Sequence, residues 1–162
     1  QIGEGIFGYV FADVDIIPLV QEQVARLEAR AANRKVALSF EHGISLPHVK
    51  ADAERLATAI SNILSNAIEY TPQGGTVAVS VTLVDTSLDV SVRDTGVGMT
   101  QEDLSNLFTK MYLGKNATKM RPDGSGLGLY VAKNILDAHH AETLVHSEEG
   151  RGTQFSFRIA IQ

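Results

Sequence analysis

The fold is decided by residues 52–98, which read DAERLATAISNILSNAIEYTPQGGTVAVSVTLVDTSLDVSVRDTGVG. Between about residues 52 and 70, apolar side chains recur every three or four positions, which predicts a helix with one buried face. These side chains are Leu56, Ile60, Ile63, Leu64 and Ala67. The proline and glycines of residues 71–75 end that helix. Two runs of alternating valine and leucine follow and predict an antiparallel hairpin that turns at residues 85–87.

The flanking sequence predicts further helices and strands on both sides. Upstream, Asp15 can cap a helix that continues to about residue 31, and residues 36–40 alternate as a short strand. Downstream, we expect a short helix with a capping box at residues 100–108. A third long helix should follow the glycines of residues 124–128 and end at about residue 138. Two strands should close the chain, at residues 143–147 and 153–161. These elements favour an α+β two-layer sandwich, in which three helices cover one face of a mixed, largely antiparallel five-stranded sheet. Residues 1–14 show no clear period and are predicted to be a linker or tail to one domain at residues 15–162.

The composition limits the classes of protein. The 162 residues carry a net charge of −5 and are 44% hydrophobic, which suits one folded domain. An acidic chain is a poor candidate for binding nucleic acid or anionic membranes, and the apolar runs are too short to span a bilayer. The absence of cysteine excludes a thiolate metal site. We therefore expect a cytoplasmic domain that contacts neither nucleic acid nor a membrane. It should belong to a longer protein, and its composition is compatible with a membrane anchor elsewhere in that protein.

Four polar residues share one side of the central predicted helix. Asn62, Asn66, Glu69 and Tyr70 fall within an arc of about 100°, beside the apolar stripe. An amide oxygen is a hard, neutral ligand that suits Mg²⁺. Two solvent-facing asparagines are the alternative, and this helix alone does not decide between them.

Two glycine motifs follow. The pattern D-x-G-x-G at residues 94–98 stands at a strand end, where a partly buried carboxylate can accept an N–H from a base such as adenine. The pattern G-x-G-x-G at residues 124–128 opens a helix, where exposed N–H groups favour phosphate. Its spacing is neither that of a P-loop nor that of a dinucleotide-binding loop. An ordinary strand-to-helix turn and a flexible loop before a helix are the respective alternatives.

A cationic loop lies between these two motifs. Lys110, Lys115, Lys119 and Arg121 carry four positive charges in a chain that is acidic overall. Such a loop can close over a polyphosphate and neutralise it. A solvated charged loop is the alternative.

The order of these motifs resembles the ATP-binding domain of sensor histidine kinases, within the gyrase, Hsp90, histidine kinase and MutL superfamily (the Bergerat fold). The resemblance extends from about residue 13 to residue 161. The matching segments are residues 62–67 (N box), 94–99 (G1 box), 107–108 (F box), 124–129 (G2 box) and 147–155.

The resemblance implies a role for each matching residue. Asn66 would bind Mg²⁺, and Asp94 would accept the adenine amino group. Asn62, Lys110 and Lys115 would act at the transferred phosphate. The residues that would contact ATP are Asn62, Asn66, Tyr70, Asp94, Gly96, Gly98, Lys110, Lys115, Gly124, Gly126, Leu127, Gly128 and Thr153. Gly96 and Gly98 would leave room for the adenine ring.

The same resemblance indicates phosphotransfer. Hydrolytic members have a glutamate in the place of Asn62, and an amide cannot take the proton of water. None of the five histidines has the H-[ED]-x-x-[TN]-P setting of the family's phosphoacceptor. We therefore expect a protein-histidine kinase catalytic domain that donates the γ-phosphate of Mg-ATP to a separate dimerisation hairpin upstream of residue 1, through which a response regulator is reached. Residues 1–14 would join the two. A degenerate, non-catalytic nucleotide-binding module and a serine-directed kinase of the same superfamily are the alternatives.

Three departures from the family pattern bear on catalytic strength. Glu69 stands where the family usually has Lys or Arg, and Met111 and Leu113 stand where Phe and Arg are usual. Phosphate neutralisation would then depend on the loop cations. The pair His139-His140 replaces the start of a His-Gly-Gly motif, and it is expected to be a polar helix end rather than a metal site.

Overall fold

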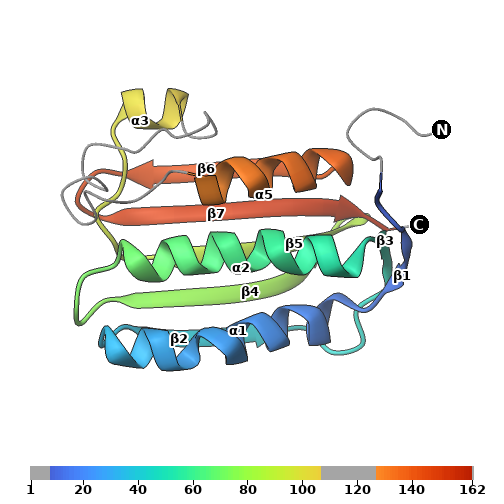
Figure 1. Cartoon of the computed structure of the whole chain (residues 1–162), viewed down its shortest axis with the longest axis horizontal. Coiled ribbons are helices and arrows are strands. Elements are labelled where there is room, and N and C mark those ends of the chain that lie inside the picture. The colour runs from blue at the N-terminus through green and yellow to red at the C-terminus, as the bar shows by residue number, and fades with distance from the viewer. Residues whose placement is uncertain (1–7, 107–126, 162) are drawn as a thin grey trace.

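The computed structural model describes residues 8–106 and 127–161 of the chain (Figure 1). Its helices and strands are β1 (Ala12–Val14), α1 (Ile16–Asn33), β2 (Ala37–His42), β3 (Val49–Ala51), α2 (Ala53–Glu69), β4 (Thr76–Val84), β5 (Ser87–Asp94), α3 (Gln101–Ser105), α5 (Leu127–Ala138), β6 (Glu142–Glu148) and β7 (Gly152–Ala160). The predicted caps are confirmed: Asp15 accepts the Ile17 N–H, and Thr100 and Asp103 form a capping box. The end predicted for the short helix, residue 108, lies outside the described residues.

One five-stranded sheet forms the first layer. Its strand order is β2-β4-β5-β7-β6, with β2 parallel to β4 and all other neighbours antiparallel. The parallel pair is possible because α2 lies between the two strands in the sequence and returns the chain to the same end of the sheet. The predicted mixed, largely antiparallel sheet is confirmed.

Three helices form the second layer. Figure 1 shows α1, α2 and α5 side by side over one face of the sheet. The middle helix is α2, which packs against both α1 and α5 and against β5. The predicted α+β two-layer sandwich is therefore confirmed.

The core lies between the two layers. Alternate residues of the central strands point to the helices, so that Val79 of β4, Val92 of β5 and Phe155 of β7 are cross-strand neighbours and all buried. Leu56 and Leu64 of α2 are completely buried against this face. Burying one such side chain contributes about 1.5–3 kcal/mol. This apolar stripe fixes the rotation of α2 and leaves its polar side, with Asn62 and Asn66, at the edge of the core.

A second, two-stranded sheet was not predicted. β1 pairs antiparallel with β3, and Val49 and Ala51 are buried. The prediction of a linker or tail at residues 1–14 is thus wrong for residues 12–14, because a three-residue strand is too short to show a period. In the described parts of the chain, no helix is both long and apolar enough to cross a bilayer.

Candidate functional site

The C-terminal half of α2 and the residue that caps it carry three of the predicted site residues. Asn62, Asn66 and Tyr70 are all half-buried. The Asn62 amide donates to the Gly128 carbonyl oxygen in the first turn of α5, at 3.2 Å. The side-chain amide of Asn66 forms no hydrogen bond within the described residues. One asparagine therefore joins the two helices, while the other presents an unused amide that fits a ligand.

Asp94 is the last residue of β5 and lies on the helix side of the sheet, in alternation with Val92 and Val90. Its Oδ1 accepts the backbone N–H groups of Gly96, at 2.8 Å, and Thr153, at 3.2 Å. Its Oδ2 has no partner in the part of the chain that the structure describes. The second oxygen is thus an available hydrogen-bond acceptor in a partly buried place.

The surroundings of Asp94 shift its ionisation. Burial raises the pKa of Asp94 from 3.8 to about 6, against the smaller opposite effect of the Gly96 and Thr153 N–H groups. Near neutral pH the group is mainly a carboxylate, and a donor that reaches Oδ2 would stabilise that charge. An amino group of a base is such a donor.

Thr153 lies directly opposite Asp94 on β7. Its hydroxyl is 2.8 Å from the Ser147 hydroxyl, which also donates to the Gly152 carbonyl and accepts the Met99 N–H at 2.9 Å. Ser147 therefore ties the glycine loop after β5 to the residue opposite Asp94. Sequence reasoning gave Ser147 no role, although it begins the matching segment 147–155.

The loop glycines are required by backbone packing. An added Cβ at Gly96 would stand 2.5 Å from the Tyr70 carbonyl oxygen, and at Gly98 (φ +70°) 2.1 Å from the Glu148 oxygen. The Val97 N–H donates to the same Tyr70 oxygen at 3.3 Å. These close approaches join the end of α2 to the loop that follows Asp94. They explain why glycine is required at both positions, independently of the predicted space for an adenine ring.

The structure thus brings eight predicted residues together, namely Asn62, Asn66, Tyr70, Asp94, Gly96, Gly98, Gly128 and Thr153. Leu127 opens α5 beside them. The other predicted residues, Lys110, Lys115, Gly124 and Gly126, lie outside the described residues, as do Lys119 and Arg121.

Glu69, which departs from the family pattern, and His139, the first residue of the altered His-Gly-Gly motif, both have structural partners. The Glu69 carboxylate forms an ion pair with Arg30 of α1, at 3.1 Å. His139 is buried, with Nδ1 2.8 Å from the Ile135 carbonyl oxygen and Nε2 accepting the Asp52 N–H at 3.0 Å. Both ring nitrogens are occupied, so a metal does not fit there. His139 is thus a polar residue at the helix end, as expected, but its ring is buried between α5 and the start of α2, which was not predicted.

Comparison with known proteins identifies the family of this chain. Residues 51–162 match the family described as histidine kinase-, DNA gyrase B-, and HSP90-like ATPase. The sensor-like histidine kinase SenX3 of Mycobacterium tuberculosis is 31% identical over 147 residues, which are 91% of this chain and 36% of that protein. The chain therefore spans little more than a third of the length of this relative.

Solved structures share the fold. The catalytic domain of histidine kinase ThkA has a TM-score of 0.80 and 25% identity, covering 93% of this chain and 95% of that one. Full-length ShkA in complex with AMPPNP has a TM-score of 0.80 and 26% identity, covering 95% and 32%. A complex of ThkA with the response regulator protein TrrA has a TM-score of 0.75 at 21% identity, covering 94% and 42%.

Proposed function

This chain belongs to the histidine kinase-, DNA gyrase B-, and HSP90-like ATPase family, and on that premise we propose that it binds Mg-ATP and donates the γ-phosphate to a histidine of a separate dimerisation hairpin. The observation that carries the proposal is Oδ2 of Asp94, which has no hydrogen-bond partner among residues 8–106 and 127–161. In this proposal, Oδ2 accepts the adenine amino group, and Tyr70 and Thr153 border the nucleotide. The AMPPNP bound to ShkA supports an adenine nucleotide as the ligand.

The two asparagines of α2 suit the phosphate end of the nucleotide. The Asn66 amide forms no hydrogen bond with the described part of the chain, and its oxygen is a suitable Mg²⁺ ligand. The Asn62 amide is held by the Gly128 carbonyl, and an amide cannot act as a general base. We therefore infer that water is poorly activated here and that the site favours transfer over hydrolysis. Bound Mg-ATP supplies the phosphoryl group, and Lys110 and Lys115, with the G2 glycines Gly124 and Gly126, are proposed to neutralise and hold it.

The relatives support the proposed partners. SenX3 is named a sensor-like histidine kinase, and ThkA has been solved with a response regulator. We propose that this domain likewise acts in two-component signalling, through a phosphoacceptor hairpin that a response regulator then reads. A degenerate module that binds nucleotide without transfer is the second candidate, which the acidic residue Glu69 favours.

Incubation with γ-labelled ATP tests the proposal. The chain alone should bind Mg-ATP, hydrolyse it very slowly and gain no acid-labile phosphate. Addition of a purified family hairpin should yield labelled hairpin, slowly, since mixing lacks the effective concentration that tethering supplies. A hairpin whose acceptor histidine is replaced by glutamine is the control. ATP binding without labelled hairpin would favour the degenerate module, and strong labelling of the chain itself would contradict the missing acceptor.

A further inference from the structure

A carboxylate lies beside the residues to which the proposed function assigns the phosphates. Glu69 shares one side of α2 with Asn62 and Asn66, and its side chain is only 21% exposed. A partly buried negative charge is poorly screened, so it would repel a polyphosphate bound to the two asparagines. The site therefore needs a compensating charge close to Glu69.

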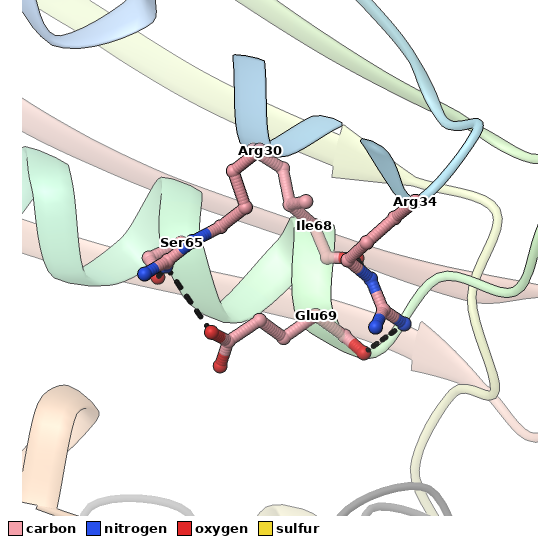
Figure 2. Close-up of polar contacts among 5 residues, drawn as sticks. All are labelled: Arg30, Arg34, Ser65, Ile68 and Glu69. Atoms are coloured by element: carbon pink, nitrogen blue, oxygen red, sulfur yellow. Dashed lines mark hydrogen bonds and ion pairs between the residues drawn. The ribbon is translucent and has the colours of Figure 1, made fainter. Parts of the chain in front are cut away.

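Arg30 of α1 supplies that charge. Its Nη1 lies 3.1 Å from Glu69 Oε2 and also donates to the Ser65 hydroxyl, one turn earlier on α2. Figure 2 shows the Arg30 side chain reaching across from α1 to both groups, with the Glu69 carboxylate turned toward it. Two partners on one helix fix the guanidinium in place, which a single contact at the surface does not do.

Arg34 fixes the backbone of the same turn. Its Nε donates to the Ile68 carbonyl at 3.2 Å, and its Nη2 to the Glu69 carbonyl at 2.8 Å. The last turn of α2 contains no basic residue of its own. Since helix C-termini favour cations, two arginines of α1 complete this helix end (Figure 2).

A second ion pair on α1 provides the contrast. Arg26 and Glu22 are 68% and 57% exposed and pair within α1, one turn before Arg30. Such exposed pairs contribute little. Arg30 instead pairs between helices with a partly buried acid, so removing it takes a positive charge away from a carboxylate that water screens poorly.

We propose that Arg30 determines the selectivity of this site for polyphosphate: by pairing with Glu69 it cancels the negative charge beside the phosphate end and thereby permits ATP to bind. This inference rests on the proposed function. The effect of Arg30 should grow with the charge of the ligand, so that ATP is affected strongly and AMP weakly. It should also disappear when Glu69 is made neutral.

Calorimetric titration of the chain with Mg-ATP and with AMP tests the inference. Arg30→Gln should weaken ATP binding about tenfold and AMP binding less than twofold, whereas Arg30→Lys, which keeps the charge, should stay within about threefold of the unaltered chain for both ligands. Arg30→Gln combined with Glu69→Gln should return ATP affinity to within about threefold of the unaltered chain. Arg26→Gln, which removes one exposed charge from the same helix, is the matched control and should change neither affinity.

Each other outcome is informative. Equal losses for ATP and AMP in Arg30→Gln would mean that Arg30 only supports the structure, which overturns the inference. A double variant as weak as Arg30→Gln would also overturn it, because Arg30 would then act on phosphate directly. If the unaltered chain binds ATP and Arg30→Gln binds it equally well, only this inference fails. If the unaltered chain binds no ATP, the proposed function fails and the inference with it.

Discussion

Asp94 combines two demands in one side chain. One oxygen holds the loop and β7 through the Gly96 and Thr153 N–H groups, while the other, in a partly buried place, accepts no hydrogen bond from the described residues. Burial makes the charge costly, as the pKa of about 6 indicates. A partly buried carboxylate with a raised pKa is typical of a site that gives up stability for function.

Replacing Asp94 by Asn should separate binding from stability. The folded pKa lies above the unfolded value of 3.8, so the folded chain binds this proton more tightly and loses stability as pH rises through about 6. At pH 7.5, Asp94→Asn should therefore raise the free energy of unfolding, by up to about 3 kcal/mol. ATP affinity should fall roughly ten- to a hundredfold, because the charged acceptor is lost. Urea unfolding and calorimetry measure the two effects, and unchanged ATP affinity would refute the role of Asp94.

The same ionisation predicts a pH dependence of binding. ATP affinity of the unaltered chain should decrease between pH 7.5 and 5.5, as Asp94 becomes protonated and Oδ2 loses its charge. Asp94→Asn serves as the control, since any pH dependence that it retains comes from other groups. Equal pH profiles for the two chains would contradict the prediction.

Asn66→Ala should remove the dependence of ATP binding on Mg²⁺. Its amide has no hydrogen-bond partner among the described residues, so the variant should unfold within a few degrees of the unaltered chain. Titrations with ATP, with and without Mg²⁺, measure the effect, and thermal unfolding by circular dichroism checks the fold. A variant that still binds more tightly with Mg²⁺ would exclude Asn66 as the metal ligand.

At the scale of elements, both ends of α5 are joined to α2. Asn62 links them beside the candidate site, and His139, just after α5, accepts the N–H of Asp52, the N-cap of α2. Asp52 also accepts the Val10 N–H at 2.8 Å, and the Phe11 ring lies 5.1 Å from His139. The segment before β1 is therefore attached to both helices that carry the site.

His139 should make this junction sensitive to acid. Burial lowers the pKa of His139 below 6.5; the Ile135 carbonyl and the Asp52 charge act in the opposite sense, and His140 lowers it further. Because the unfolded chain then binds the proton more tightly, the stability due to His139 is lost as pH falls below about 6.5. His139→Phe should cost about 1–3 kcal/mol at pH 7.5, since the Asp52 N–H loses its acceptor.

Urea unfolding at pH 7.5 and 5.5 measures this prediction. The difference between His139→Phe and the unaltered chain should shrink at the lower pH, where the unaltered chain must keep His139 neutral against its tendency to protonate. Asp94 is present in both chains, so its opposite effect cancels. A difference that is constant or larger at pH 5.5 would contradict the prediction.

At the scale of the whole molecule, the two sheets should differ in stability. β5 is paired on both sides, by β4 and β7, and contributes Leu88, Val90 and Val92 to the core. Within the described ranges of the chain, β1 and β3 pair with each other alone, over three residues. Backbone amides of β5 should thus exchange with solvent only by global unfolding, and those of β1 by local opening, at least about tenfold faster. Amide hydrogen exchange followed by NMR measures both, and equal rates would show that the small sheet unfolds together with the core.

The sequence by itself determined what depends on local order. The helix period of residues 52–70, the alternation in β4, β5 and β7, and the caps at Asp15 and Thr100 all matched the structure closely. The four polar residues of α2 were predicted on one side because the apolar stripe fixes the rotation of that helix. The family motifs then predicted which of them would face a ligand.

Only the tertiary structure decided the contacts between distant segments. The parallel pairing of β2 with β4, the pairing of β1 with β3, the burial of His139 and the Arg30–Glu69 ion pair all join residues that are far apart in the chain. The periodicity of the sequence does not predict such pairs, because each partner taken alone could also lie at an exposed position. Asp94 shows the same division: its place at a strand end is local, but its raised pKa arises from burial by segments that meet only when the sheet and the helices pack together.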